Sequence, residues 1–236
     1  VEFEEKFYAA GQILGSRFQR REGRPSDEAV LSARIVDRTI RPLFNQKARR
    51  DIQVVVTVLA VGEDDPDVLG VIGASLALSV SDIPWDGPVG AVRIGRTKDT
   101  GAIVLNPTYM QRTEGLLDVE ILACGKDGTI NMIETAASEA KESEVLQMLE
   151  RAVSEHKKIE AFHTEIVTAI GKSKRIITLP EAPTALTELF QTQFAQKLSD
   201  TLFSNRAGKD HIYALKSAFL TETKTKDIDQ TLASDF

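Results

Sequence analysis

The sequence predicts an α+β domain followed by an all-helical region, and three observations point to this fold class. Apolar runs that are rich in β-branched residues, or that alternate with polar residues, occur up to about residue 138. Two segments with helical patterning lie between these runs, one after Ser26 and one from Val68. From Lys141 onward, apolar residues recur with a helical period instead. We place the boundary near Glu160, so that residues 1–159 form the α+β domain and residues 160–236 the helical region.

The composition is that of a globular protein of the cytoplasm. With 236 residues and 42% hydrophobic content, the chain can bury a sizeable core. It contains no apolar run long enough to span a membrane and no signal-peptide pattern. The single cysteine, Cys124, excludes an internal disulfide framework and fits a reducing compartment, and its apolar surroundings make it a core residue. The sequence begins abruptly at Val1, and we expect it to be a piece of a longer protein.

The first predicted helix begins at Ser26 and displays a stripe of arginines. Ser26 is a typical N-capping residue, acidic residues follow it, and Pro42 ends the helix. Arg34, Arg38 and Arg41 recur at positions i, i+4 and i+7, so their guanidinium groups share one face. The opposite face, predicted to lie on a core, carries Ala29, Ala33, Val36 and Ile40.

Positive charge is concentrated around this helix. The net charge of the chain is −6, yet residues 17–50 hold ten Arg and Lys against four Asp and Glu. The local balance of +6 leaves −12 for the remainder. One interpretation is a solvated face in which Glu22 and Asp37 neutralise two arginines. For the whole set we favour phosphate binding, because a positive cluster in an acidic chain is costly unless a ligand uses it.

The next segments predict a buried strand and a helix of small residues. Residues 52–61 read IQVVVTVLAV, which is typical of a strand buried on both faces. Asp64, Asp65 and Asp67 follow, and clustered carboxylates could bind magnesium. We favour helix capping for them, because they surround a proline directly before the apolar helix of residues 68–80.

Two hairpins are predicted between this helix and residue 138. GAVRIGRTK and AIVLNP flank a turn at Thr100-Gly101, and LLDVEILACG and TINMIETAAS flank the sequence KDG. In the second pair the apolar residues alternate, which predicts strands with one solvated face. Trp85, before the first pair, is predicted to fill the end of the sheet.

The remainder is predicted to be helical, with one long helix from Lys141 to Gly171 and two shorter ones at residues 184–203 and 210–220. A linker with two prolines separates the long helix from the others. His156, Glu160 and His163 share one face of the long helix, and Glu160-x-x-His163 is similar to a metal-binding pattern. Because no second such pattern occurs, we favour a solvated face.

The arginine segment also carries a family resemblance. FQRREGRPSDEAVLSARIVDRTIRPLF resembles the loop and helix of the first ribonuclease-PH-like core domain of bacterial polynucleotide phosphorylases, and the likeness continues through DIQVVVTVLAVGEDDPDVLGVIGASLALSVSDIPWDGPVGAVRIG. It is weaker from about Tyr109, and the helical region resembles the interdomain helices of the family in general character. The resemblance implies a ribonuclease-PH-like (ribosomal protein S5 domain 2-like) fold that lacks its first strands.

The resemblance also implies an activity. Polynucleotide phosphorylases degrade single-stranded RNA, including mRNA, from the 3′ end, with inorganic phosphate as co-substrate, and release nucleoside diphosphates. Mg²⁺ and phosphate are bound mainly by the second core domain, which we expect to be absent here. The family predicts a homotrimeric ring, with possible partners in an RNA-degradation assembly. We therefore expect no catalytic or metal-binding residue in this fragment and no activity from it alone.

Family positions carry over to seven residues as RNA contacts. Phe18, Arg20 and Arg21 match the loop that grips RNA at the entry constriction. Basic positions that lead towards the active centre are matched by Arg24, Arg34, Arg38 and Arg41. Because Arg17-Phe18-Gln19 precedes the basic pair, only Phe18 offers a stacking ring where the family usually has two apolar residues, and the loop is expected to be one residue longer.

Two other functions are open to the sequence. One is a non-catalytic RNA-binding ring subunit of an exosome-like assembly, which would lack a second core domain on the same chain. The other is an enzyme that acts on a small phosphorylated molecule, which is disfavoured because its site would not need arginines at seven positions. The sequence shows no nucleophile-elbow motif, no zinc-ligand spacing and no carboxylate pair that we can assign to acid–base catalysis.

Overall fold

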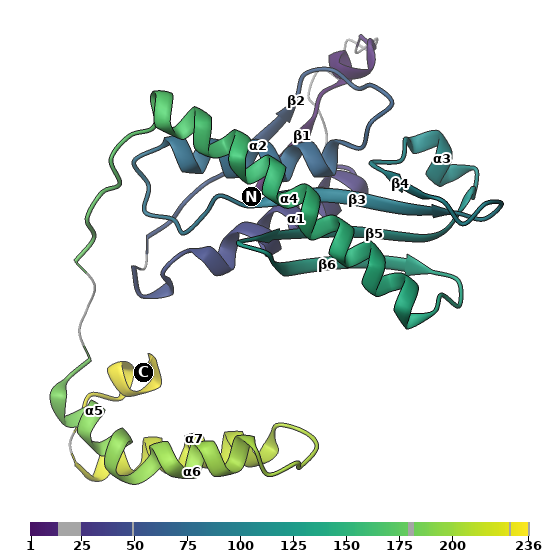
Figure 1. Ribbon diagram of the computed structural model, residues 1–236. Helices are drawn as coiled ribbons and strands as arrows, with labels where there is room; N and C mark the ends of the chain where they lie inside the picture. The colour runs from purple at the N-terminus through teal and green to yellow at the C-terminus, as the bar shows by residue number, and fades with distance from the viewer. Residues whose placement is uncertain (14–24, 49, 179–181, 227, 236) are drawn as a thin grey trace. The chain divides into compact units, whose positions relative to one another are not determined.

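The computed structural model describes residues 1–13, 25–48, 50–178, 182–226 and 228–235. Four residues predicted to contact RNA, Phe18, Arg20, Arg21 and Arg24, lie outside these ranges. The chain forms two compact units, Val1–Ile177 and Thr178–Phe236 (Figure 1). The boundary expected near Glu160 falls inside the long helix α4 (Glu142–Ile170), which continues beyond it.

A four-stranded antiparallel sheet forms the centre of the first unit. Its strands are β3 (Gly90–Thr97), β4 (Ile103–Leu105), β5 (Leu117–Lys126) and β6 (Thr129–Ala137), in the order β4-β3-β5-β6. Gly101 has a φ of +67° between β3 and β4, and Asp127 and Gly128 have φ of +52° and +77° between β5 and β6. Left-handed residues at these positions make tight turns, so both predicted hairpins are confirmed.

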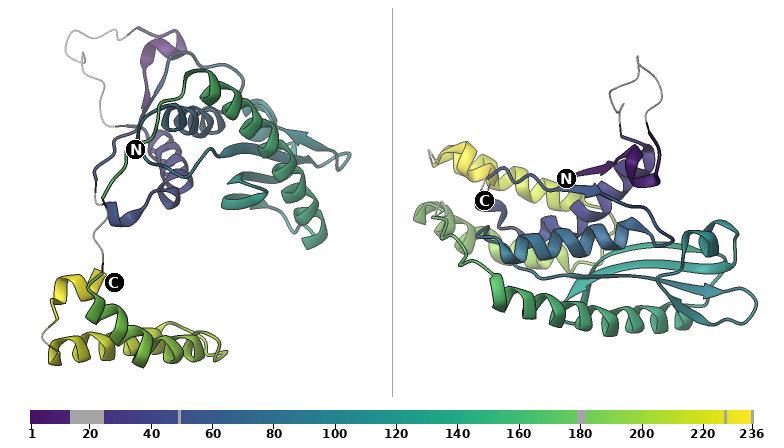
Figure 2. Two further views of the ribbon diagram at one scale, coloured as in Figure 1. Left: turned by 60° about the vertical axis from the view of Figure 1, so that its left-hand side comes forward. Right: turned by 90° about the horizontal axis from the view of Figure 1, so that it is seen from above.

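Helices cover both faces of this sheet (Figures 1 and 2). The first part of α4 lies on β3 and β5, where Met148 and Ala152 are buried against Val92 and Ile121. On the other face, α1 (Asp27–Ile40) and α2 (Pro66–Val80) form the larger hydrophobic core with the sheet. Both faces of β5 are therefore covered, and the prediction that it has one solvated face is wrong. In the β5–β6 hairpin, only β6 is mostly exposed, because it is the edge strand of the sheet.

A second, two-stranded sheet lies beside α1 and α2. Its strands, β1 (Glu2–Glu5) and β2 (Val55–Val58), are parallel, with Phe3 opposite Val56. Residues 52–61 were predicted to be buried on both faces, and this is wrong, because Val55 is 47% exposed and Leu59 is 72% exposed. Only the face that carries the buried Phe3 packs on the helices.

The small residues of α2 allow this close packing. A Cβ atom on Gly70 would lie 2.9 Å from Cε2 of Phe3, so a larger residue would force β1 and α2 apart. The helix is therefore a small-residue packing helix, as its sequence predicts. Its N-terminus is also capped as predicted, because Asp65 accepts a hydrogen bond of 2.9 Å from the amide of Asp67.

Short helices complete the first unit: η1 (Phe7–Ala10), η2 (Arg41–Leu43), η3 (Gln46–Ala48) and α3 (Tyr109–Thr113). The sequence analysis did not predict α3, which begins at a capping box formed by Thr108 and Gln111. Trp85 is buried at the edge of the core, as predicted, and its Nε1 donates to the carbonyl of Ile40 over 3.1 Å. Cys124 is buried as predicted, and burial raises the pKa of its thiol to about 12.

In the second unit, every described element of regular secondary structure is a helix. It contains α5 (Thr184–Leu189), the π-helical turn η4 (Phe190–Phe194), α6 (Ala195–Leu202), α7 (Asp210–Thr225) and α8 (Gln230–Asp235). The predicted helices at residues 184–203 and 210–220 are confirmed. Leu186, Leu189, Phe194 and Phe219 form a separate small core. Among the described residues of both units, no helix is long and apolar enough to cross a membrane.

Candidate nucleic-acid interface

Local sequence signals position the arginine helix as predicted. The side chain of Ser26 accepts a hydrogen bond of 3.0 Å from the amide of Ala29, which caps α1. The helix ends at Ile40 and passes into η2, which contains Pro42. Ala29, Val36 and Ile40 are buried and Ala33 is half-buried. The predicted core face is therefore confirmed, and the arginines lie on the exposed side.

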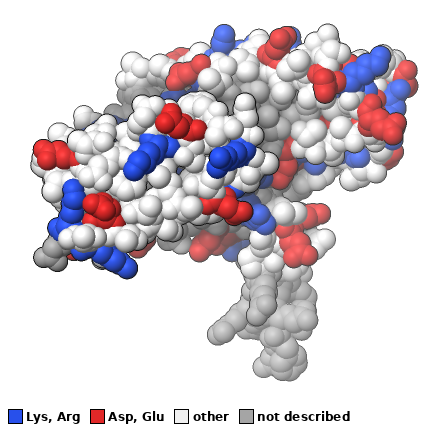
Figure 3. Space-filling view, turned by 90° about the horizontal axis from the view of Figure 1, so that it is seen from below, with Lys and Arg blue, Asp and Glu red and all other residues white. Residues whose placement is uncertain are grey.

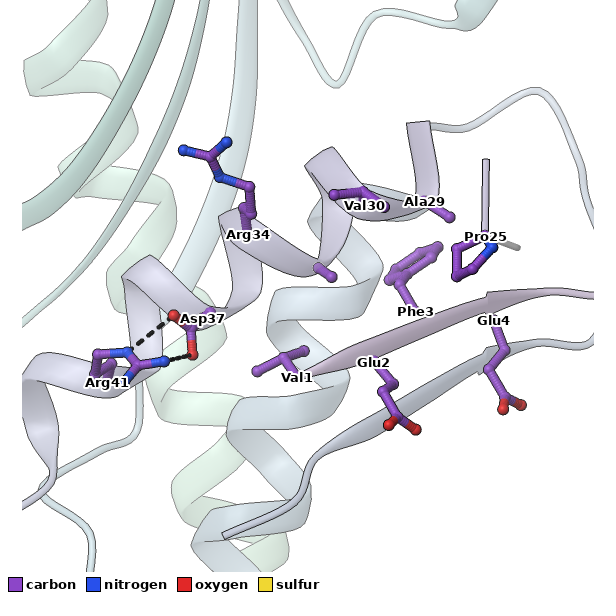
Figure 4. A pocket seen from close by; sticks show the side chains of 11 residues that line it. Val1, Glu2, Phe3, Glu4, Pro25, Ala29, Val30, Arg34, Asp37 and Arg41 are labelled. Atoms are coloured by element: carbon purple, nitrogen blue, oxygen red, sulfur yellow. Dashed lines mark hydrogen bonds and ion pairs between the residues drawn. The ribbon is translucent and has the colours of Figure 1, made fainter. Parts of the chain in front are cut away.

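The three arginines differ in their partners. Arg41 is held by Asp37 through two bonds, Nε to Oδ2 over 2.9 Å and Nη2 to Oδ1 over 2.7 Å (Figure 4). Arg38 donates to Glu134 on β6 over 3.2 Å. Arg34 has no hydrogen-bond or ion-pair partner among the described residues. The alternative to phosphate binding considered above named Glu22 and Asp37 as the neutralising acids. Asp37 does pair with Arg41, whereas Glu22 lies outside the described residues, and Glu134, the partner of Arg38, was not one of the acids named.

Arg34 borders a hollow of about 430 Å³ between α1 and β1. Apolar side chains, including Phe3, Ala29 and Val30, line much of it, while Glu2 and Glu4 stand on the β1 side (Figure 4). Figure 4 shows the guanidinium of Arg34 directed away from these acids. The group is therefore exposed and available to an external anion.

On the face drawn in Figure 3, the described lysines and arginines form no broad positive patch. On the face drawn in Figure 3, basic and acidic side chains are interspersed. Most exposed ion pairs of this kind contribute little to stability, because water screens them. On this face, the described residues offer no general positive field.

Two of the three aspartates after β2, Asp65 and Asp67, belong to a buried ion network, whereas Asp64 is exposed. Arg93 contacts Asp65 over 2.7 Å and Asp67 over 3.2 Å, and it also contacts Glu120. Arg112 joins Glu120 over 2.8 Å and also contacts Asp65. These acids are occupied by arginines, and the described residues contain no group of three His, Cys, Asp or Glu side chains that could hold a metal ion. Capping and ion pairing, rather than a magnesium site, account for them.

This network reaches the arginine helix through Ser32. The hydroxyl of Ser32 lies on the buried side of α1 and contacts both Asp67 and the carbonyl of Glu28. The pKa of the Asp67 carboxyl is raised, mainly by burial. The nearby negative charge of Asp65 raises it further. Sequence analysis missed Arg93 and Arg112 as partners, because they come from β3 and α3, far along the chain.

The two histidines of α4 are core residues, and the prediction of a solvated face is wrong for them. His156 is 1% exposed, with Nε2 2.9 Å from the carbonyl of Ala123, and His163 is 0% exposed, with Nδ1 3.3 Å from Oγ of Ser75. Burial lowers the pKa of both rings. His156 follows the buried Ala152 by four residues, so both lie on the same face of α4.

The fold and these sites can now be compared with known proteins. Residues 1–84 match the model of the 3′ exoribonuclease family, domain 1, and residues 87–155 match that of the 3′ exoribonuclease family, domain 2. The chain belongs to the 3′ exoribonuclease family. The two matched segments together span α1, α2, the whole four-stranded sheet and the first half of α4.

Three relatives of this chain share the name polyribonucleotide nucleotidyltransferase. The protein of Thermomicrobium roseum is 44% identical over 86% of this chain, and that of Thermus thermophilus 45% over 77%. The protein of Exiguobacterium sibiricum is 38% identical over the whole chain. The chain spans only 25%, 25% and 30% of the length of these three proteins, respectively.

Two solved structures share the fold of this chain. The rice Rrp46 structure matches with a TM-score of 0.52 at 15% identity, over 62% of this chain and 68% of that one. The Archaeoglobus fulgidus exosome, solved with RNA bound to the active site, matches with a TM-score of 0.51 at 14% identity, over 68% of each chain. At these identities the likeness shows the fold alone, which is the predicted α+β fold of ribonuclease-PH type.

Proposed function

We propose that this chain is part of a 3′-to-5′ phosphorolytic exoribonuclease, a polyribonucleotide nucleotidyltransferase that degrades single-stranded RNA and mRNA. The observation that carries the proposal is the 38% to 45% identity to proteins of that name over 77% to 100% of the chain. In this reaction, an oxygen of inorganic phosphate attacks the terminal phosphodiester. The 3′ oxygen of the shortened RNA leaves, and a nucleoside diphosphate is released.

Within this enzyme, the chain guides RNA towards the reacting centre. Arg34, which has no partner among the described residues, binds a backbone phosphate, while Arg38 and Arg41, already paired with acids, adjust the local charge. The same proposal assigns Phe18 to base stacking and Arg20, Arg21 and Arg24 to the RNA backbone. Phosphoryl transfer depends mainly on positioning and on charge neutralisation, and arginines supply both.

Magnesium is proposed for the other core domain of the whole protein. Asp65, Asp67 and Glu120 are held by Arg93 and Arg112 and do not fit a magnesium site. We therefore assign no step of the reaction to a metal at these residues. We further propose that the whole protein is a cytoplasmic homotrimer, with possible partners in RNA degradation.

The test is release of ADP from a poly(A) oligonucleotide in the presence of phosphate and magnesium. The whole protein is expected to release ADP only when phosphate is present. The 236-residue chain, shown to be folded by circular dichroism, is expected to bind the RNA with marked salt dependence and to release none. ADP release by this chain alone would contradict the division of labour, and absence of RNA binding would contradict the guiding role.

The alternative is a non-catalytic ring subunit of an exosome-like assembly. The solved exosome structures resemble the chain in fold alone, whereas the sequence identity is to the nucleotidyltransferases. The same assay separates the two proposals, because a non-catalytic subunit would bind poly(A) and release no ADP even as the whole protein.

A further inference from the structure

The C-terminus of α2 lacks the usual local cap. Helices often end at a glycine that satisfies the last carbonyl groups, but α2 is followed by Ser81 and Asp82. The amide of Ser81 donates to the carbonyl of Ala77 over 3.2 Å. The hydroxyl of Ser81 donates to the carbonyl of Leu78 over 2.8 Å. The carbonyls of Ser79 and Val80 receive nothing from these residues.

A segment almost a hundred residues further along supplies the missing donors. The amide of Lys172 donates to the carbonyl of Val80 over 3.0 Å. The ammonium group of Lys174 donates to the carbonyls of Leu78, Ser79 and Ser81 over 2.7, 3.0 and 2.8 Å. All three hydrogens of that group are thus used, and all of the last four carbonyls of α2 have partners.

The same segment is fixed by Arg175. Its amide donates to the carbonyl of Asp82 over 2.8 Å, and its Nε donates to the carboxylate of Asp82 over 2.5 Å. Residues 172–175, which we call the docked linker, have no regular secondary structure, yet they follow residues 78–82 closely. These bonds explain why the first compact unit extends to Ile177 and does not end with α4 at Ile170.

We propose that Lys174 is a latch that fixes the point at which the linker to the helical unit leaves the first unit. The C-terminus of a helix carries partial negative charge, so it binds an ammonium group better than a neutral donor. Hydrogen bonds from charged donors are also stronger than those between neutral groups. The latch therefore depends on the positive charge of Lys174, whereas Lys172 contributes only its backbone amide.

Hydrogen exchange of the full chain tests the latch with a matched pair of variants. In K174Q, the amides of Lys172 and Arg175 are expected to exchange about tenfold faster or more, since a charged hydrogen bond is lost. K172Q removes one positive charge from the same segment but no hydrogen bond, and it is expected to leave the exchange rate of Arg175 unchanged. K174R retains the charge and the donors, and should keep most of the protection.

Two results would overturn the proposal. One is unchanged exchange of Arg175 in K174Q, which would mean that the other bonds hold the linker alone. The other is equal acceleration in K172Q and K174Q, which would indicate a general effect of charge. Amides in the centre of β5 serve as an internal standard, because a global loss of stability would accelerate them too.

Discussion

At the scale of single residues, the arginines of α1 differ although their spacing makes them look equivalent. The helical period placed all three on one exposed face, and that placement depends only on local structure. One partner, Asp37, is also local, because it lies four residues before Arg41. The other, Glu134, comes from a strand almost a hundred residues later, and no local pattern could reveal it.

Arg34 is therefore expected to matter most for RNA binding. Replacing it with alanine removes a guanidinium that has no partner among the described residues, so the affinity of the full chain for a single-stranded RNA should fall. The slope of log K against log salt concentration should become shallower by about 0.7. R41A should cost less, because Asp37 already neutralises that charge.

The control for this measurement is R151A. Arg151 lies on α4, is half-exposed and pairs with Glu155 over 2.9 Å. Filter-binding or anisotropy titrations at several salt concentrations should show no change for R151A. If R34A and R151A behave alike, Arg34 does not contact RNA.

The buried histidines predict that acid destabilises the first unit. Burial lowers the pKa of both rings below the ordinary 6.5, and Nδ1 of His156 and Nε2 of His163 have no partner among the described residues. The unfolded chain therefore binds more protons as the pH falls below about 6.5. Stability should be full above this pH and should decrease below it, by at most about 1.4 kcal/mol per pH unit for each ring.

A glutamine at position 156 isolates this effect. Its amide can still donate to the carbonyl of Ala123, but it does not titrate. Urea unfolding between pH 7.5 and pH 5 should therefore give a flatter pH dependence for H156Q than for the wild type. Parallel curves would show that His156 is not a source of the acid sensitivity.

At the scale of secondary structure, two glycines of one helix have opposite roles. A methyl group on Gly70 would collide with the ring of Phe3, whereas one on Gly73 would meet nothing within 4 Å. We expect G70A to destabilise the protein by about 1–3 kcal/mol through overpacking. G73A should stabilise it by about 0.5–1 kcal/mol, because alanine restricts the unfolded chain.

Urea unfolding of the two variants provides the measurement, and each serves as the control for the other. Both exchange glycine for alanine in α2, so their helix-propensity effects are similar. Equal changes in stability would contradict the close contact between α2 and β1.

The strands show where sequence analysis reaches its limit. Helix ends, hairpin turns and the small-residue face of α2 were predicted, because capping, turn chemistry and periodicity act over a few residues. The burial of the strands was not predicted correctly. Residues 52–61 are mostly apolar but pair with one short strand, whereas the alternating β5 lies at the centre of four strands under α4. The number of neighbours in a sheet is set by distant residues.

At the scale of the whole molecule, the two compact units have separate cores. Phe219 is 7% exposed, and its ring packs edge-on to those of Phe190 and Phe194 at centroid distances of 5.9 and 5.2 Å. Truncation to alanine typically costs about 3–5 kcal/mol, and a unit of this size has little stability to spare. F219A should therefore unfold the helical unit.

Hydrogen exchange should confine this damage to the second unit. Amides of α5, α6 and α7 are expected to lose protection in F219A, while those of β5 keep theirs. Y213A is the control, because Tyr213 is an aromatic residue of α7 that is largely exposed. Loss of protection in β5 would mean that the units depend on each other for stability.

The distance along the chain between α2 and Lys174 has a consequence for synthesis on the ribosome. Leu78 and Lys174 are 96 residues apart. At typical bacterial and eukaryotic elongation rates, the second is made roughly 5–20 s after the first. During that interval the carbonyls of Ser79 and Val80 lack the donors that Lys174 and Lys172 later supply, and water can bond to them instead. Nascent chains that stop between β6 and the end of α4 should therefore display a frayed α2, which closes once residue 174 has emerged.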